Sequence, residues 1–80
     1  MRLPRDVGGE DLAKLLAKLG YEITRQTGSH LRLSRQAIPE HHITVPRHRA
    51  LRVGTLNNIL KDIAKHSKIS KEEVIRQLWG

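Results

Sequence analysis

The sequence predicts an α+β domain with the element order α-β-β-β-α, followed by a short C-terminal helix. Apolar residues recur with helical spacing in two stretches, residues 12–19 and 56–64. Between these stretches, three short segments alternate apolar and polar residues, which is the period of half-buried strands. The loops between the three segments are short, and short loops favour an antiparallel meander.

The first helix is predicted by a single stripe of leucines: Leu12, Leu15, Leu16 and Leu19. Gly8 or Gly9 is suited to the N-cap, and the acidic residues that follow are suited to the positive end of the helix dipole. Gly20 follows the stripe, where a left-handed residue commonly ends a helix. The segment before this helix, residues 1–8, reads as a short lead-in.

The first two strands are expected at residues 21–26 and 30–34, joined by a turn in which Gly28 takes a positive φ. A loop at residues 35–40 leads to the third strand, residues 42–45, which Pro46 ends. The expected inward side chains are those of Ile23, Leu31, Leu33, Ile43 and Val45. The expected outward side chains, on one polar face, are those of His30, Arg32, His42 and Thr44.

The second helix is predicted by a second apolar stripe: Leu56, Ile59, Leu60, Ile63 and Ala64. Thr55 is the expected N-cap, and His66 is expected to be a favourable cation near the C-terminus. The sequence Ser70-Lys71-Glu72-Glu73 has the spacing of a capping box and predicts the start of the third helix. This order of elements is that of the double-stranded-RNA-binding fold.

Composition narrows the class of partner. Eighty residues, taken as a single domain over residues 1–80, carry a net charge of +7, which favours a polyanion or an acidic protein. Cysteine is absent, which excludes disulfides, thiol catalysis and cysteine-based zinc sites. One Tyr, one Trp and no Phe disfavour modules that stack bases on aromatic platforms. The chain has neither an apolar stretch of membrane-spanning length nor the apolar core of a signal peptide, so we expect a cytoplasmic protein without a membrane contact.

Four motifs, in this order, resemble the HicA toxins: residues 12–21, Arg25-Gln26-Thr27-Gly28-Ser29-His30, Val45-Pro46-Arg47-His48, and Gly54-Thr55-Leu56 with Ile59-Leu60. The resemblance covers roughly residues 8–66. It implies a small messenger-RNA interferase with a double-stranded-RNA-binding-like fold, encoded beside a HicB antitoxin. It also implies that the histidine of the Gly-Ser-His motif, His30, is catalytic.

An endoribonuclease that works without a metal needs an acid, a base and cations for the phosphate charge. Histidine can transfer protons near neutral pH, and arginine donates paired hydrogen bonds to phosphate. We therefore expect His30 to transfer protons, with His42 or His48 as candidates for its partner. The candidate RNA-binding residues are Ser29, Arg25, Arg32, Arg47, Arg49, Arg52 and Lys61. No cofactor and no metal are expected, because His41 and His42 point to opposite faces of a strand.

Three functions remain open on the sequence. The first is a histidine-dependent endoribonuclease toxin that acts on messenger RNA and is inhibited by a HicB-like antitoxin. The second is a non-catalytic RNA-binding module with the same fold, in which the hairpin histidine is incidental. The third is a basic interaction domain whose partner is a protein.

Overall fold

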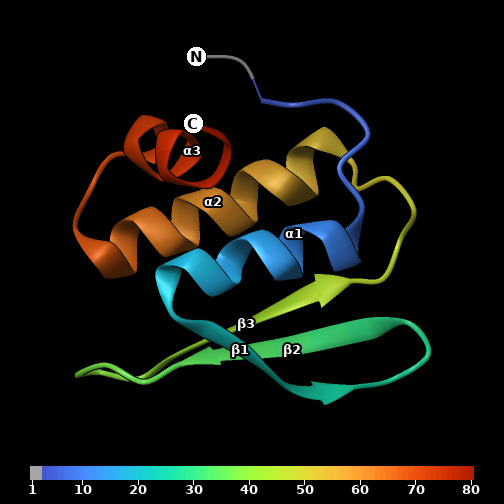
Figure 1. Ribbon diagram of the computed structural model, residues 1–80, viewed down its shortest axis with the longest axis horizontal. Coiled ribbons are helices and arrows are strands. Elements are labelled where there is room, and N and C mark those ends of the chain that lie inside the picture. Colours follow the sequence, from blue (N-terminus) through green and yellow to red (C-terminus); the bar gives the residue numbers. More distant parts are fainter. Residues whose placement is uncertain (1–2) are drawn as a thin grey trace.

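The computed structural model describes residues 3–80, so the first two residues of the predicted lead-in, Met1 and Arg2, lie outside the described residues. Its elements follow in the order α1 (Gly9–Leu16), a 3-10 turn η1 (Ala17–Leu19), β1 (Tyr21–Gln26), β2 (His30–Arg35), β3 (His41–Pro46), α2 (Val53–Ser67) and α3 (Lys71–Trp79). Figure 1 shows the helices gathered on one side of the sheet. The predicted α+β order and the C-terminal helix are confirmed.

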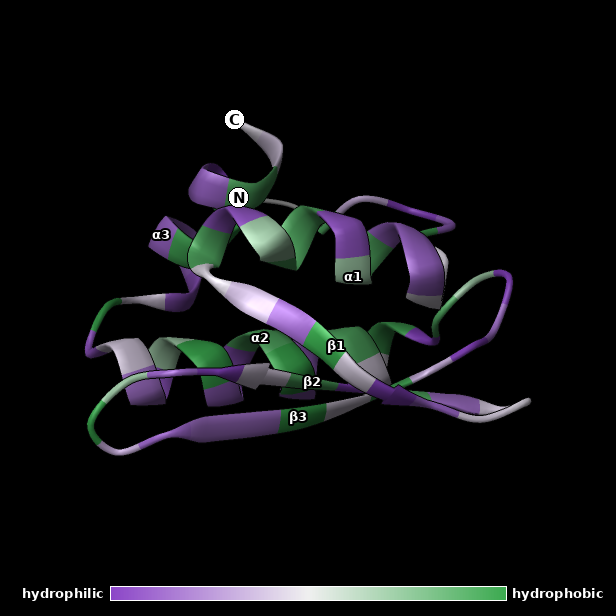
Figure 2. Cartoon of the chain, turned by 60° about the horizontal axis from the view of Figure 1, so that its bottom comes forward, coloured by the Kyte–Doolittle hydropathy of each residue, from purple (hydrophilic) through white to green (hydrophobic). Residues whose placement is uncertain are grey.

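The sheet has the strand order β1-β2-β3, and both pairs of strands are antiparallel. In Figure 2 hydrophobic bands lie between hydrophilic ones along the strands, which is the alternation on which the strand prediction rests. Leu31 and Leu33 of β2 are buried, whereas His30 and Arg32, which alternate with them, are exposed. One face of the sheet is therefore covered by the helices, and the other face, here called the outer face, is polar.

The core is continuous from the sheet through α1 and α2 to α3. All three helices contribute side chains that are at most 3 % exposed, among them Leu12, Leu60 and Val74. Tyr21 is also buried, at 2 % exposure. The predicted inward residues are buried or half-buried with one exception.

The exception is Ile23, which is 48 % exposed, so the prediction that it belongs to the core is wrong. It lies on β1, an edge strand that has a neighbour on one side only. Its side chain borders an open hollow with Lys14, Gln26 and Leu31. Strand alternation gives the face of the sheet but not how far the helices extend over it.

The start of α1 lies against the end of β3. Gly8 is the N-cap, and the backbone N–H of Gly9 donates to the carbonyl of His48 at 3.0 Å. A Cβ atom on Gly9 would lie 1.9 Å from the carbonyl oxygen of Pro46, so only glycine fits there. At the other end, Gly20 adopts the predicted left-handed conformation, with φ +88°. Both glycines therefore set the path of the chain around α1.

The second helix begins three residues earlier than expected. Arg52, and not Thr55, is the N-cap of α2, and Thr55 lies within the first helical turn. The prediction for α3 is confirmed, because the Ser70 hydroxyl accepts a hydrogen bond from the backbone N–H of Glu73 at 3.1 Å. Among residues 3–80, no helix combines the length and the apolar character that crossing a membrane requires.

Candidate functional site

The turn between β1 and β2 presents His30 and is built by Thr27. The backbone N–H of Thr27 donates to the carbonyl of His30 at 2.9 Å. The Thr27 hydroxyl accepts from the N–H groups of His30 and Ser29, at 3.0 and 3.3 Å. Gly28 does not have the expected positive φ, and a Cβ atom there would meet nothing within 4 Å. The threonine side chain, rather than glycine geometry, therefore shapes this turn.

His30 opens β2 as an exposed side chain. Its Nδ1 atom lies 2.9 Å from the Ser29 hydroxyl. A hydroxyl can donate or accept, so Ser29 can orient the imidazole in either neutral tautomer. Nε2 has no hydrogen-bond partner among residues 3–80. The ring is thus held by one nitrogen while the other is free to exchange a proton with a ligand.

Two arginines lie beside His30 on the outer face. The register shifts between Ile23 and Arg25, and this β-bulge places Arg25 directly opposite Arg32. Both arginines are exposed, and neither forms an ion pair within the described part of the chain. Like charges in directly opposite positions destabilise a sheet. The pair therefore favours a bound anion.

Farther from the β1–β2 turn, the outer face carries a hydrogen-bonded network of hydroxyl and imidazole groups. The Ser34 hydroxyl lies 2.6 Å from Nδ1 of His42 and 3.2 Å from the Thr24 hydroxyl. His30 is opposite Pro46, and His42 is four residues from Pro46, or about 13 Å along the strand. His42 therefore belongs to a separate polar network and is not placed to share one phosphate with His30.

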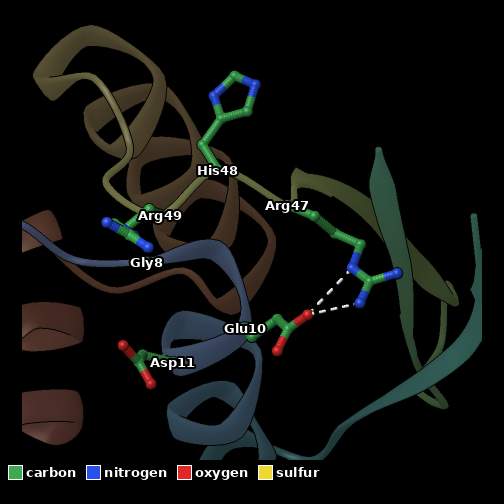
Figure 3. A pocket seen from close by; sticks show the side chains of 6 residues that line it. All are labelled: Gly8, Glu10, Asp11, Arg47, His48 and Arg49. Carbon is green, nitrogen blue, oxygen red and sulfur yellow. Dashed lines mark hydrogen bonds and ion pairs between the residues drawn. The ribbon is translucent and has the colours of Figure 1, made fainter. Parts of the chain in front are cut away.

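The loop after β3 returns to the same end of the sheet as the β1–β2 turn (Figure 1). The loop and the start of α1 border a shallow pocket of about 340 Å³, lined by Gly8, Glu10, Asp11, Arg47, His48 and Arg49 (Figure 3). Nε and Nη2 of Arg47 both donate to Oε1 of Glu10, at 3.1 and 2.6 Å. Arg49 and His48 are exposed. In Figure 3 the imidazole of His48 points away from the Arg47–Glu10 pair.

The remaining predicted cations are divided between two surfaces. Arg52 is exposed at the N-cap of α2, at the end of the loop that carries Arg49. Lys61 is exposed on α2, in the helix layer, and therefore not on the outer face with His30. The structure thus brings together the turn, the arginine pair and the loop, and leaves Lys61 apart from them.

A second polar cluster, which the sequence analysis did not anticipate, lies at the opposite end of the sheet. The Tyr21 hydroxyl lies 2.6 Å from Nδ1 of His41, whose Nε2 lies 3.2 Å from Asp62. The rings of His41 and His66 stack with their centroids 4.3 Å apart. The guanidinium of Arg35 lies over the Tyr21 ring at 4.6 Å.

Burial governs the ionisation of this cluster. Desolvation raises the pKa of Tyr21, partly offset by the Arg35 charge. Desolvation lowers the pKa of His41, an effect that Asp62 opposes and His66 reinforces. His41 and His42 point to opposite faces as expected, and residues 3–80 contain no group of three or more His, Asp or Glu placed to hold a metal.

His66, in the last turn of α2, forms hydrogen bonds through both ring nitrogens. Nδ1 lies 2.6 Å from a guanidinium nitrogen of Arg35, which can only donate. Nε2 lies 2.7 Å from the carbonyl of Pro39, which can only accept. His66 therefore links α2 to β2 and to the β2–β3 loop through both of its ring nitrogens.

Comparison with known proteins identifies one family. Residues 9–64 match the family model described as the HicA toxin of bacterial toxin–antitoxin systems, which is more than half of the chain. The match spans α1, the sheet and most of α2, and it includes the turn, the arginine pair and the loop. No curated protein and no solved structure matches the chain.

Proposed function

Because the chain belongs to the HicA toxin family of bacterial toxin–antitoxin systems, we propose that it is an endoribonuclease that cleaves messenger RNA by proton transfer at His30. The observation that carries this proposal is the His30 ring, exposed on the outer face with Nδ1 oriented by Ser29 and Nε2 unbonded among the described residues. In that state His30 can take a proton from a ribose 2′-hydroxyl or give one to the leaving oxygen.

The neighbouring cations would supply the electrostatic part of the reaction. Arg25 and Arg32 are directly opposite each other in the sheet, near His30, where two guanidinium groups would hydrogen-bond the phosphate oxygens. Arg49 and Arg52 extend positive charge from the same end of the sheet onto the loop, where they would bind the RNA backbone. Lys61 would contact a bound RNA only if the RNA also extended over the helix layer.

The family also implies an antitoxin. A HicB-like protein with acidic groups would complement the net charge of +7 and inhibit the toxin by covering the surface around His30. Such inhibition predicts that RNA and antitoxin compete for the same arginines.

The test compares cleavage of messenger RNA, in the presence of EDTA, by wild-type protein, His30→Ala and His42→Ala. We expect His30→Ala to cleave at least roughly a hundredfold more slowly, since loss of one positioned acid or base costs 10²–10⁴-fold. His42→Ala is the matched control, because it removes an exposed histidine of the same face that lies outside the site.

The fold should survive both substitutions. The His30 side chain is exposed, so truncation opens no core cavity and changes the free energy of unfolding by within ~0.5 kcal/mol. Thermal melting therefore separates loss of chemistry from loss of structure. Wild-type cleavage by a folded His30→Ala protein would rule out the mechanism and favour a non-catalytic RNA-binding module.

A further inference from the structure

Arg47 connects three segments that are far apart in the sequence. Its backbone N–H donates to the carbonyl of Ser29 at 2.8 Å, and its Nη1 donates to the carbonyl of Thr27 at 2.7 Å. Its Nε and Nη2 donate to Oε1 of Glu10 in the first turn of α1. One residue at the end of β3 therefore holds both carbonyls that flank Gly28 and anchors them to a helix.

The turn has no other such support in the part of the chain that the structure describes. Thr27 and Ser29 otherwise bond only within the hairpin, through the Thr27 backbone and hydroxyl and the His30 ring. The turn residues 27–29 are exposed, so core packing does not hold them. The position of the turn relative to the body of the molecule thus depends on Arg47, whereas the backbone of His30 is also held opposite Pro46 in the sheet.

The same contacts leave Arg47 poorly suited to bind a phosphate. Arg47 donates four hydrogen bonds in these contacts. Three of them come from the guanidinium, which is directed at Glu10 and Thr27. The Glu10 carboxylate neutralises the charge, and the Arg47 side chain is only 29 % exposed. A phosphate would have to displace an existing ion pair.

We propose that Arg47 is a positioning residue that fixes the β1–β2 turn, and with it His30, against α1, instead of contacting RNA. This inference rests on the proposed function of His30. It assigns to the Arg47–Glu10 pair a role in the rate of cleavage rather than in the affinity for RNA. An arginine fork can span the Thr27 carbonyl and the Glu10 carboxylate together, whereas the compact ammonium of lysine can reach only one of them.

The experiment compares Arg47→Ala, Arg47→Lys and Glu10→Ala with the wild-type protein. Arg76→Ala is the matched control, because Arg76 forms the same kind of surface pair with Glu73 on α3, away from the turn. Three quantities are measured: the {¹H}–¹⁵N NOE of residues 27–30, kcat for RNA cleavage, and Kd for RNA with its salt dependence.

We expect the NOE of residues 27–30 to fall in Arg47→Ala and to stay at the wild-type value in Arg76→Ala. We expect kcat to fall about ten- to a hundredfold, the scale of a small misplacement of a catalytic group. Kd should change less than about twofold with an unchanged salt slope, because no phosphate contact is lost. Arg47→Lys should not restore kcat.

Glu10→Ala separates the two roles of Arg47 even if Arg47→Ala does not fold. Glu10 is 60 % exposed, and its removal frees the guanidinium. A positioning role predicts a lower kcat, whereas a phosphate contact predicts tighter RNA binding with kcat unchanged. The second result would overturn the proposal, as would a salt slope reduced by about one unit in Arg47→Ala, the loss of one phosphate contact.

The proposal and the proposed function fail in different ways. If wild-type protein cleaves no RNA, the endoribonuclease function fails, and the NOE of residues 27–30 still decides whether Arg47 holds the turn. An unchanged NOE in a folded Arg47→Ala protein would overturn the proposal whatever the activity.

Discussion

At the scale of single residues, hydrogen-bond partners define the roles of the histidines better than their positions in the sequence do. His30 bonds through one nitrogen to Ser29 and is exposed, whereas both nitrogens of His66 are bonded inside the molecule. His42 is also exposed, but its Nδ1 lies 2.6 Å from the Ser34 hydroxyl and its Nε2 lies 3.6 Å from the Glu40 carboxylate. Among these three histidines, only His30 has an exposed ring nitrogen that forms neither a hydrogen bond nor an ion pair in the described structure.

The pKa of His41 leads to a prediction about stability and pH. Desolvation lowers this pKa in the folded state below its ordinary value of 6.5, despite the opposing charge of Asp62. As pH falls below about 6.5, the unfolded chain takes up a proton before folded His41 does, so stability decreases. Protonation would also place positive charge beside Arg35 and the stacked ring of His66. We expect the urea concentration at the midpoint of unfolding to decrease as the pH is lowered from 7.5 to 5.5.

The control for this prediction is a histidine substitution elsewhere. His41→Gln should make the urea midpoint less dependent on pH in this range, and His48→Gln, at an exposed position, should leave the wild-type dependence. An equally steep decrease in His41→Gln would assign the effect to another group.

At the scale of elements, the first turns of α1 and α2 each contain a glycine, and the two glycines have opposite surroundings. Gly9 lies against the carbonyl of Pro46, while a methyl group added at Gly54, in the first turn of α2, would meet nothing within 4 Å. Gly9→Ala should destabilise by about 1–3 kcal/mol, as overpacking does. Gly54→Ala should stabilise by roughly 0.5–1 kcal/mol through helix propensity. Chemical denaturation of the two variants measures both changes in the free energy of unfolding. Changes of the same sign would contradict the difference in packing between the two glycines.

The elements could be predicted because their signals are local. The stripe of leucines, the left-handed Gly20 and the Ser70 N-cap each depend on residues a few positions apart, and these three predictions are confirmed. The bulge that places Arg25 opposite Arg32 is a property of two paired strands, and alternation in one strand does not reveal it. The exposure of Ile23 likewise depends on how far the helices extend over an edge strand.

The sequence indicates the residue types of the candidate site but not their contacts. The Gly-Ser-His motif indicated His30, and the structure adds the Ser29 bond and the Thr27 turn. No pattern in the sequence pairs Glu10 with Arg47, which are 37 positions apart. Long-range ion pairs of this kind follow from the packing of α1 against the end of β3.

At the scale of the whole molecule, the arrangement of charge predicts how RNA binds. A net charge of +7 with few aromatic residues favours binding through the phosphate backbone. We expect log K to fall steeply with log salt concentration, and Arg49→Ala and Arg52→Ala each to reduce the slope by about one unit. Arg76→Ala, on α3, should leave the slope unchanged. Filter binding at several salt concentrations measures these slopes, and unchanged slopes in both loop variants would remove the loop from the RNA interface.

The link between Arg47 and the β1–β2 turn has a consequence for the cell that synthesises this chain. The ribosome completes the strand that begins with His30 well before it reaches Arg47, so an interrupted chain carries the histidine without the residue that positions it. Such a chain also lacks α2 and α3, and with them a large part of the core. We therefore expect the arrangement around His30 to assemble only after the whole sheet and the helices that cover it have been synthesised.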